Sequence, residues 1–169
     1  MKKPVKPRST KRAVRSPRAV KKSGSRPALS GRDLRELQQM VLRSALAGEP
    51  LPGTGEAVRL PDLQFVTHDG KVLLSDEDLS GRPSVSGAGT PLRIISSSTI
   101  AREAKSAQDL AYLRFQPVQV DEEGVSVTLS GEMAASPGRR SLGLSSVRVK
   151  FRKVDGQWEA VGGPVASAS

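Results

Sequence analysis

The stretches VSVTLSGEM (125–133) and LSSVRVKFRKVDGQWEAVG (144–162) decide the fold of this chain. In both, apolar residues recur at every second position, starting at Val125 and at Val147. This alternation is typical of strands that bury one face and expose the other. Asp155-Gly156 lies inside the second stretch and supplies the two residues that a tight hairpin turn needs. The sequence therefore predicts antiparallel strands joined by short turns.

The stretch before these strands, AYLRFQPVQV (111–120), is also strand-like, and a turn at Asp121–Gly124 follows it. Pro117 cannot donate a hydrogen bond to a strand ladder, so we expect an edge strand or a bulge there. Together the strand-like stretches predict a four-stranded antiparallel meander. Trp158 is expected to face the core of this sheet together with Phe151.

Helices are predicted upstream of the meander. Ser30 and Asp33 form a start that resembles a capping box, apolar residues follow at helical spacing from Leu34, and Gly48 with Pro50 ends the pattern. Helices first and an antiparallel sheet afterwards are typical of the α+β class. In chain order, the expected elements before the meander are a helix over about 32–47, a short hairpin over 63–74, one helical turn capped by Ser75, a brief strand over 91–96, and a helix from Ser97 or Ser98 to about Asp109.

At 169 residues, the chain is long enough for one folded domain and a tail. The first 30 residues repel one another electrostatically and contain four prolines, so they are expected to be disordered in isolation. The expected parts are a disordered basic tail (1–30), the first helix (31–48), a Pro/Gly-rich linker (49–62), an α+β domain (63–162) and a flexible C-terminus (163–169).

Tyr112-Leu-Arg-Phe115 begins a strand directly after the second expected helix, and FRKVDGQWEAVG (151–162) closes the meander. On these residues, over roughly 92–162, the chain resembles the C-terminal half of nuclear-transport-factor-like or cystatin-like domains, and uncharacterised bacterial proteins with a Tyr-Leu-Arg-Phe strand. The resemblance implies a curved sheet wrapped on a helix, sometimes around a cavity. Enzymes of that class place Asp, His or Tyr in the cavity; here Tyr112 and Asp109 fall nearest to that position, without a partnering histidine.

Electrostatic charge is divided unevenly along the chain. Twelve of the first 32 residues are Lys or Arg and none is acidic, whereas residues 33–169 carry 15 basic and 17 acidic residues. Basic groups spaced along a flexible chain neutralise phosphates and release counterions without preference for base sequence. The tail has no aromatic residue for base stacking, which argues against dedicated single-strand recognition. The candidate polyanion-binding residues are Lys2, Lys3, Lys6, Arg8, Lys11, Arg12, Arg15, Arg18, Lys21, Lys22 and Arg26.

These features favour a non-enzymatic accessory protein whose tail tethers a small α+β domain to nucleic acid or another polyanion. An anionic membrane surface or an acidic protein is a further partner class, because polybasic segments bind anionic lipids at ~1 kcal/mol per residue. The alternative function is a small-ligand binder or enzyme of the nuclear-transport-factor-like class, with a cavity in its sheet. We expect a bacterial cytoplasmic protein, associated with the nucleoid or the ribosome, that uses no cofactor.

Three segments resemble functional motifs but lack their context. LPGTG (51–55) matches a sortase signal, yet no apolar span follows it. SGAGT (86–90) has the glycines of a phosphate-binding loop without the lysine that should come after them. His68 is the single histidine and precedes a turn, and the chain has no cysteine, so a zinc site would lack ligands. We therefore expect no catalytic residue, no metal site and, for want of a run of ~20 apolar residues, no membrane span.

Charged clusters occur at three further places. The acidic triplets 76–78 and 121–123 lack the ligand spacing of an EF-hand loop. The first is expected to place negative charge at a helix start and the second to solvate a turn, while either could dock the basic tail. Arg148, Lys150 and Arg152 share one face of a strand, which we interpret as a solvated face, with an extension of the tail's footprint as the alternative.

Overall fold

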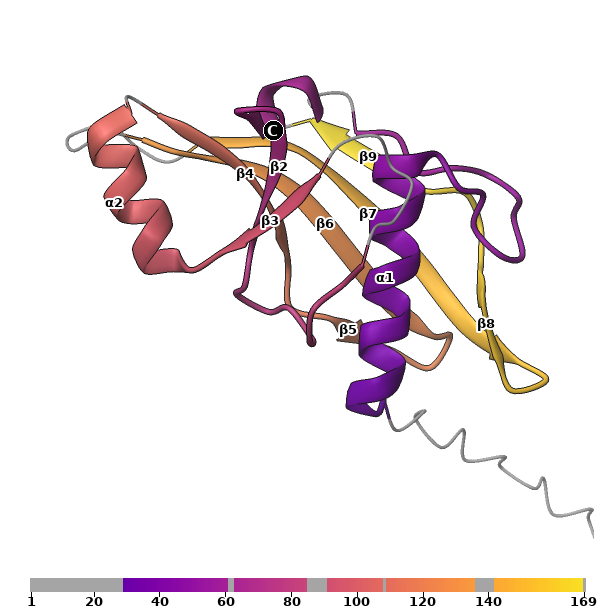
Figure 1. The fold of residues 1–169 in the computed structure, drawn as a ribbon. Helices are drawn as coiled ribbons and strands as arrows, with labels where there is room; N and C mark the ends of the chain where they lie inside the picture. The colour runs from indigo at the N-terminus through magenta and orange to yellow at the C-terminus, as the bar shows by residue number, and fades with distance from the viewer. Residues whose placement is uncertain (1–28, 61–62, 85–90, 108, 136–141, 169) are drawn as a thin grey trace, which may run out of the picture.

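The computed structural model describes residues 29–60, 63–84, 91–107, 109–135 and 142–168. In this part of the chain, two α-helices accompany a nine-stranded sheet that curls around the first helix (Figure 1). The elements in chain order are α1 (Gly31–Ala47), the 3₁₀ turn η1 (Leu63–Val66), β1 (Thr67–His68), β2 (Lys71–Ser75), β3 (Leu92–Ile95), α2 (Ser97–Ala107), β4 (Leu110–Phe115), β5 (Gln119–Val120), β6 (Val125–Ala134), β7 (Leu142–Val154), β8 (Gln157–Ala160) and β9 (Val165–Ala168).

The sheet is mixed, so the predicted fold of a helix plus a four-stranded antiparallel meander is wrong. Strands β1, β2, β4, β6, β7 and β8 follow one another across the sheet, while β3 pairs with β2, β5 with β6, and β9 with β7. The pairings of β2 with β3 and with β4 are parallel, and the remaining pairings are antiparallel. The physical reason lies in β2, where Val72, Leu73 and Leu74 are all buried. A strand that is covered on both faces is typical of parallel pairing rather than of an exposed hairpin.

Helix α1 forms as the sequence predicts. The Ser30 hydroxyl accepts a hydrogen bond of 3.1 Å from the backbone N–H of Asp33, and the Asp33 carboxylate accepts one of 3.2 Å from the backbone N–H of Ser30. This reciprocal capping box satisfies two N–H groups at the helix start. At the other end, Gly48 adopts a left-handed conformation (φ 69°) and donates its N–H to the Ser44 carbonyl oxygen, which ends the helix.

The main core lies between α1 and the sheet. Leu37 and Leu42 of α1 are fully buried against strand residues that include Phe115 and Phe151. Trp158 belongs to the same cluster and is buried, so the prediction that it faces the core with Phe151 is confirmed. The face of the sheet that wraps α1 is therefore an apolar core, and it is not lined by the polar side chains of a binding site.

A second, smaller core lies on the opposite face of the sheet. Here Ile100 and Ala104 of α2 pack against Leu73, Leu110 and Tyr112. Figure 1 shows α2 standing at one end of the sheet, well away from α1. Adjacent residues of β4 thus point to different cores, which separates Tyr112 from the aromatic residues of the main core.

Several local predictions need correction. The hairpin predicted over 63–74 is confirmed in part: β1 pairs with β2 through a turn with Asp69 and Gly70 at positive φ, but Leu63–Val66 form the 3₁₀ turn η1 rather than strand. The single turn expected after Ser75 is present, and the Ser75 hydroxyl accepts from Glu77 N–H, but the turn is not helical. Leu79 N–H donates to the Asp76 carbonyl oxygen, and Asp78 has a left-handed φ of 56°. The cap of α2 is Ser96, whose hydroxyl accepts from Thr99 N–H, rather than Ser97 or Ser98.

The strand-like stretch 111–120 is divided at Pro117 into β4 and β5, because proline cannot continue the ladder. The C-terminus, expected to be flexible, pairs with β7 through β9. Its small residues gave no alternation strong enough to predict a strand.

The LPGTG segment is a folded turn packed against β8. Gly55 N–H donates to the Leu51 carbonyl oxygen at 2.9 Å, and Ala160 N–H donates to the Pro52 carbonyl oxygen at 2.7 Å. Leu51 is buried in the main core, and a Cβ at Gly53 would press on the backbone of Ala160. The LPGTG segment is therefore part of the folded chain that follows the basic tail, which we call the body. The other glycine-rich segment, 86–90, lies outside the described residues.

Candidate functional site

The predicted polyanion-binding residues, Lys2 to Arg26, lie outside the described residues. The described chain begins at Leu29, which packs against the main core, and leads directly into the Ser30 cap of α1. The basic tail is therefore joined to the body at the N-terminus of α1.

The Asp33 carboxylate joins this helix end to the β7–β8 hairpin. It accepts hydrogen bonds from the indole Nε1–H of Trp158 at 2.9 Å and from Lys153 Nζ at 3.2 Å, while the Lys153 ammonium also lies 5.3 Å from the centre of the indole ring. The hydrogen bond from Ser30, followed by those from Trp158 and Lys153, holds the pKa of Asp33 well below its usual range. Asp33 thus stays charged and ties the root of the tail to the sheet.

The acidic triplet 121–123 is engaged by a cation of the body. Lys150 Nζ lies 2.6 Å from a carboxylate oxygen of Glu123 and 3.0 Å from one of Asp121. The hydrogen bonds that Lys150 donates to Glu123 and Asp121 raise the pKa of Lys150, and the hydrogen bond from Lys150 lowers the pKa of Asp121. The triplet therefore does more than solvate the turn: it pairs with β7.

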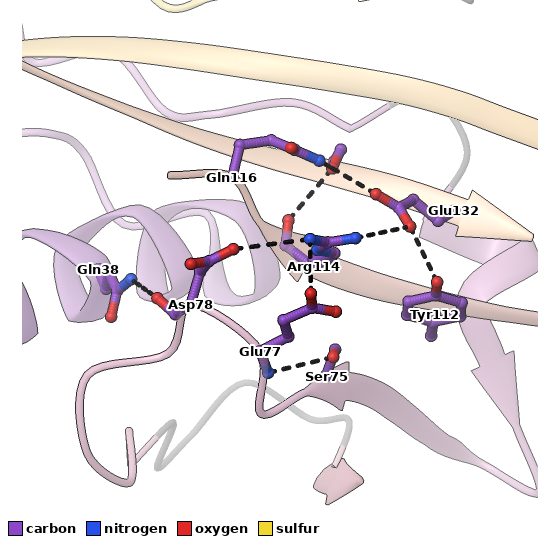
Figure 2. Close-up of polar contacts among 9 residues, drawn as sticks. Gln38, Ser75, Glu77, Asp78, Tyr112, Arg114, Gln116 and Glu132 are labelled. Atoms are coloured by element: carbon purple, nitrogen blue, oxygen red, sulfur yellow. Dashed lines mark hydrogen bonds and ion pairs between the residues drawn. The ribbon is translucent and has the colours of Figure 1, made fainter. Parts of the chain in front are cut away.

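The acidic triplet 76–78 is engaged by Arg114 (Figure 2). The Arg114 guanidinium lies 3.0 Å from Glu77, 3.6 Å from Asp78 and 3.8 Å from Glu132. Arg114 projects from β4 on the face opposite the main core, where it is partly buried. The expectation that this triplet charges a helix start is wrong; its carboxylates instead neutralise an arginine on the sheet.

Glu132 of β6 is the second centre of this cluster, which Figure 2 shows with Tyr112 and Gln116 beside it. Its carboxylate accepts from the Tyr112 hydroxyl at 2.8 Å and from Gln116 Nε2 at 3.0 Å. Burial, reinforced by the hydrogen bond to Glu132, raises the pKa of Tyr112 far above its usual range. Tyr112 therefore remains a protonated donor near neutral pH and is not suited to act as a base.

Gln38 of α1 extends the cluster to the other side of the segment 76–80. Its side chain donates to the Asp78 carbonyl oxygen and accepts from Ser80 N–H, both at 2.7 Å. The segment is thus held between Gln38 on α1 and Arg114 on β4. We define the Arg114 cluster as Glu77, Asp78, Tyr112, Arg114, Gln116 and Glu132. We infer that its role is structural rather than catalytic, since it holds the segment 76–80 against the sheet.

The basic residues of β7 do not form a continuous positive surface. Lys150 is paired with the 121–123 triplet and Lys153 with Asp33, while Arg148 and Arg152 are exposed. Arg152 lies opposite Glu159 of β8 in the strand register. Two of the four basic residues of β7 are therefore engaged in ion pairs within the body.

His68 is half-exposed at the β1–β2 turn, with its Nδ1 atom 3.3 Å from the Asp69 carboxylate. Within the described ranges, no group of three or more His, Cys, Asp or Glu residues is arranged to hold a metal ion. The same part of the chain contains no helix that is both long and apolar enough to cross a membrane.

Two hollows lie beside the Arg114 cluster on the outer face of the sheet. One, of about 380 Å³, is lined by residues of β6 and β7 together with Gln116 and Glu132. The other, of about 360 Å³, lies under α2 and is lined by Tyr112, Ile100 and Glu77. Neither the two hollows nor the cluster between them is predicted by the sequence. The available signal is the set of polar residues at every second position of β6, which is also typical of an ordinary solvent-exposed face.

Comparison of the chain with protein-family models, curated proteins and solved structures yields no match. Functional inference for this protein accordingly rests on its own residues.

Proposed function

We propose that the protein is a non-enzymatic interaction protein, in which the basic tail tethers the folded body to nucleic acid or to another polyanion. The observation that carries this proposal is the separation of charge between tail and body. Eleven of the first 28 residues are cationic and none is acidic. Such a density of one sign attracts polyanions through counterion release.

The ion pairs within the body support the same proposal. Eight carboxylates of the body pair with the body's own Lys and Arg side chains: Asp33, Glu49, Glu77, Asp78, Glu103, Asp121, Glu123 and Glu132. Residues of both acidic triplets are among them, and these triplets were the expected internal docking places for the tail. A tail that meets a body with eight of its 17 acidic groups already paired is better placed to bind an external polyanion.

The nuclear-transport-factor-like alternative finds less support. It requires a polar cavity on the concave face of the sheet, and that face is the apolar main core. Tyr112 lies on the opposite face with its hydroxyl bound to Glu132. The interaction function is therefore preferred.

Binding of full-length protein to short duplex DNA at increasing salt tests the proposal. If about six tail cations engage phosphates, affinity should fall ~10³-fold between 50 and 200 mM salt. Duplexes of shuffled sequence should bind equally well, because backbone contacts carry no sequence information. The tail variant replaces six cations by glutamine: Lys11, Arg12, Arg15, Arg18, Lys21 and Lys22.

A matched control keeps the tail and removes two exposed cations of the body, Arg148→Gln and Arg152→Gln. The tail variant should lose most of the binding, whereas the control should retain nearly all of it. Equal losses in the two variants would place the binding surface on the body. If full-length protein does not bind DNA or RNA at low salt but does bind anionic vesicles, the polyanion would be a membrane surface rather than nucleic acid.

A further inference from the structure

The outer hollow beside Glu132 continues into a second one. A hollow of about 160 Å³ is lined by residues of β6, β7 and β9, and it shares Thr128 and Ser146 with the hollow of about 380 Å³. The two hollows together form a groove that runs from Gln116, at the end of β4, across β6 and β7 to Ser167 of β9. Three strand spacings of ~4.8 Å make it roughly 14 Å across.

Five of the twelve residues that line this outer groove carry hydroxyl groups. Ser130 and Ser145 are only 7% and 4% exposed, so they lie at its floor rather than on its rim. The remaining hydroxyls are those of Thr128, Ser146 and Ser167. The Ser130 hydroxyl already donates to the Arg114 carbonyl oxygen and accepts from Gln116 Nε2, so it is engaged within the protein. The hydroxyls of Thr128, Ser146 and Ser167 can each donate and accept, and they suit a ligand that does the same.

Charge in the outer groove is largely compensated. The carboxylate that lines it, Glu132, already accepts hydrogen bonds from Tyr112 and Gln116 and faces the Arg114 guanidinium. Arg148 lies at the opposite end. Since the groove presents neither a bare carboxylate nor a cluster of cations, it suits a neutral ligand better than an ion.

Two apolar side chains border the same groove. Leu142 is 59% exposed and Val165 is 62% exposed, and both line the groove. Exposed apolar side chains beside a polar floor provide two kinds of contact in one place. Sugar rings have the matching chemistry, with hydroxyl groups at their edges and apolar C–H groups on their faces.

The sheet is locally irregular at this groove. The register between β6 and β7 shifts between Ser130 and Glu132, because two residues of β7, Leu144 and Ser145, lie opposite the single residue Gly131 of β6. This places a bulge in β7. Bulges re-aim side chains and are over-represented next to functional sites. Here the bulge lies where Ser130 and Glu132 both face the groove, so it contributes to the shape of the lining.

From these observations we propose that the outer groove binds a neutral oligosaccharide. The groove is longer than one pyranose ring. The hydroxyls of Thr128, Ser146 and Ser167 contact sugar hydroxyls, while Leu142 and Val165 contact ring faces. This proposal does not depend on the polyanion-binding tail, because the groove lies on the body and holds no tail residue.

The test uses full-length, isotopically labelled protein and three neutral probes: maltohexaose, cellohexaose and hexa-N-acetylchitohexaose. Amide chemical shifts are recorded during titration into the millimolar range. At least one probe should perturb residues around Thr128 and Ser146 in a saturable manner. The double variant Thr128→Val and Ser146→Ala keeps the shape of the groove but removes two hydroxyls, and it should weaken that binding roughly tenfold or more.

The control variant Ser97→Ala and Ser98→Ala removes two hydroxyls from α2, outside the groove, and should bind as the wild type does. Unchanged thermal midpoints confirm that both double variants are folded. Absence of saturable shifts with all three probes would overturn the proposal. So would binding that the groove variant and the α2 variant weaken equally.

Discussion

The indole N–H of Trp158 donates a 2.9 Å hydrogen bond to the carboxylate of Asp33, which lies 125 residues earlier in the chain. The same carboxylate closes the capping box of α1. One side chain therefore sets the start of the helix and fixes that start to the last hairpin of the sheet. This contact fixes the N-terminus of α1 to the sheet at the point where the basic tail joins the body.

Asp33 should make the stability of the protein depend on acidic pH. Its pKa is lower in the folded than in the unfolded protein, so its stabilising contribution is complete above about pH 4 and is lost as pH falls further. The thermal midpoint of the wild type should therefore drop steeply below pH 4. The Asp33→Asn variant, which lacks the charge, should start lower and decline less over the same range.

The control for this titration is Asp155→Asn, in the exposed β7–β8 turn, where asparagine tolerates the positive φ. This variant should follow the wild-type profile. Parallel profiles for the wild type and Asp33→Asn would show that the Asp33 carboxylate does not carry the acid sensitivity.

Trp158→Ala should destabilise the protein by ~3–5 kcal/mol, the usual cost of removing a buried large aromatic side chain. Trp158 is 5% exposed and belongs to the main core, and its loss also removes a donor to Asp33. Denaturant unfolding followed by circular dichroism measures the cost. Trp158 is the only tryptophan, so native fluorescence with the maximum of a fully exposed indole would contradict its burial directly.

Gly124→Ala should be more damaging than Gly156→Ala, although both glycines have positive φ. A Cβ at Gly124 would collide with the backbone carbonyl of Phe151, whereas a Cβ at Gly156 would meet nothing. The difference between the two unfolding free energies should be about 1–3 kcal/mol, the cost of overpacking. Equal stabilities would mean that β6 and β7 separate easily at this turn.

Tyr112 should resist ionisation in the folded protein. Burial and the hydrogen bond to Glu132 raise its pKa, and it is the only tyrosine, so ultraviolet titration reports on it alone. Absorbance of tyrosinate should appear well above pH 10, and stability should decline above pH 10 because the unfolded chain ionises first.

In Glu132→Gln, tyrosinate should appear at lower pH than in the wild type, because the negative charge and its hydrogen bond are lost. Burial is the larger cause of the shift, so the variant should remain above the value for free tyrosine. A wild-type titration centred near pH 10 would show that Tyr112 is accessible to water.

Local signals in the sequence were sufficient to predict α1 and the β7–β8 hairpin. The capping box at Ser30 and Asp33 and the Asp155-Gly156 turn act within a few residues of themselves, so tertiary contacts did not override them. The parallel pairing of β2 depends on strands far along the chain. The one local sign of this parallel pairing is the unbroken apolar run from Val72 to Leu74. The same run is equally compatible with one strand of a hairpin.

The Arg114 cluster could not be predicted for a similar reason. Glu77, Arg114 and Glu132 lie on three separate segments, and each looks like an ordinary surface charge when taken alone. The alternation of apolar and polar residues along β4 and β6 shows which residues share a face of the sheet. It does not show which strands are neighbours. The groove beside the cluster depends in addition on β9, whose residues carry no strand signal.

Attachment of the tail at Ser30 determines how a mechanical load would enter the body. A pull on the tail reaches α1, which belongs to no strand ladder and is fastened by Asp33 to Trp158, by Gln38 to the segment 76–80, and by Ser44 to Val58. These fastenings lie one after another along the helix, so force breaks them in sequence and does not have to shear the whole sheet at once. A body anchored through its tail would therefore yield first by peeling of α1, beginning at Asp33.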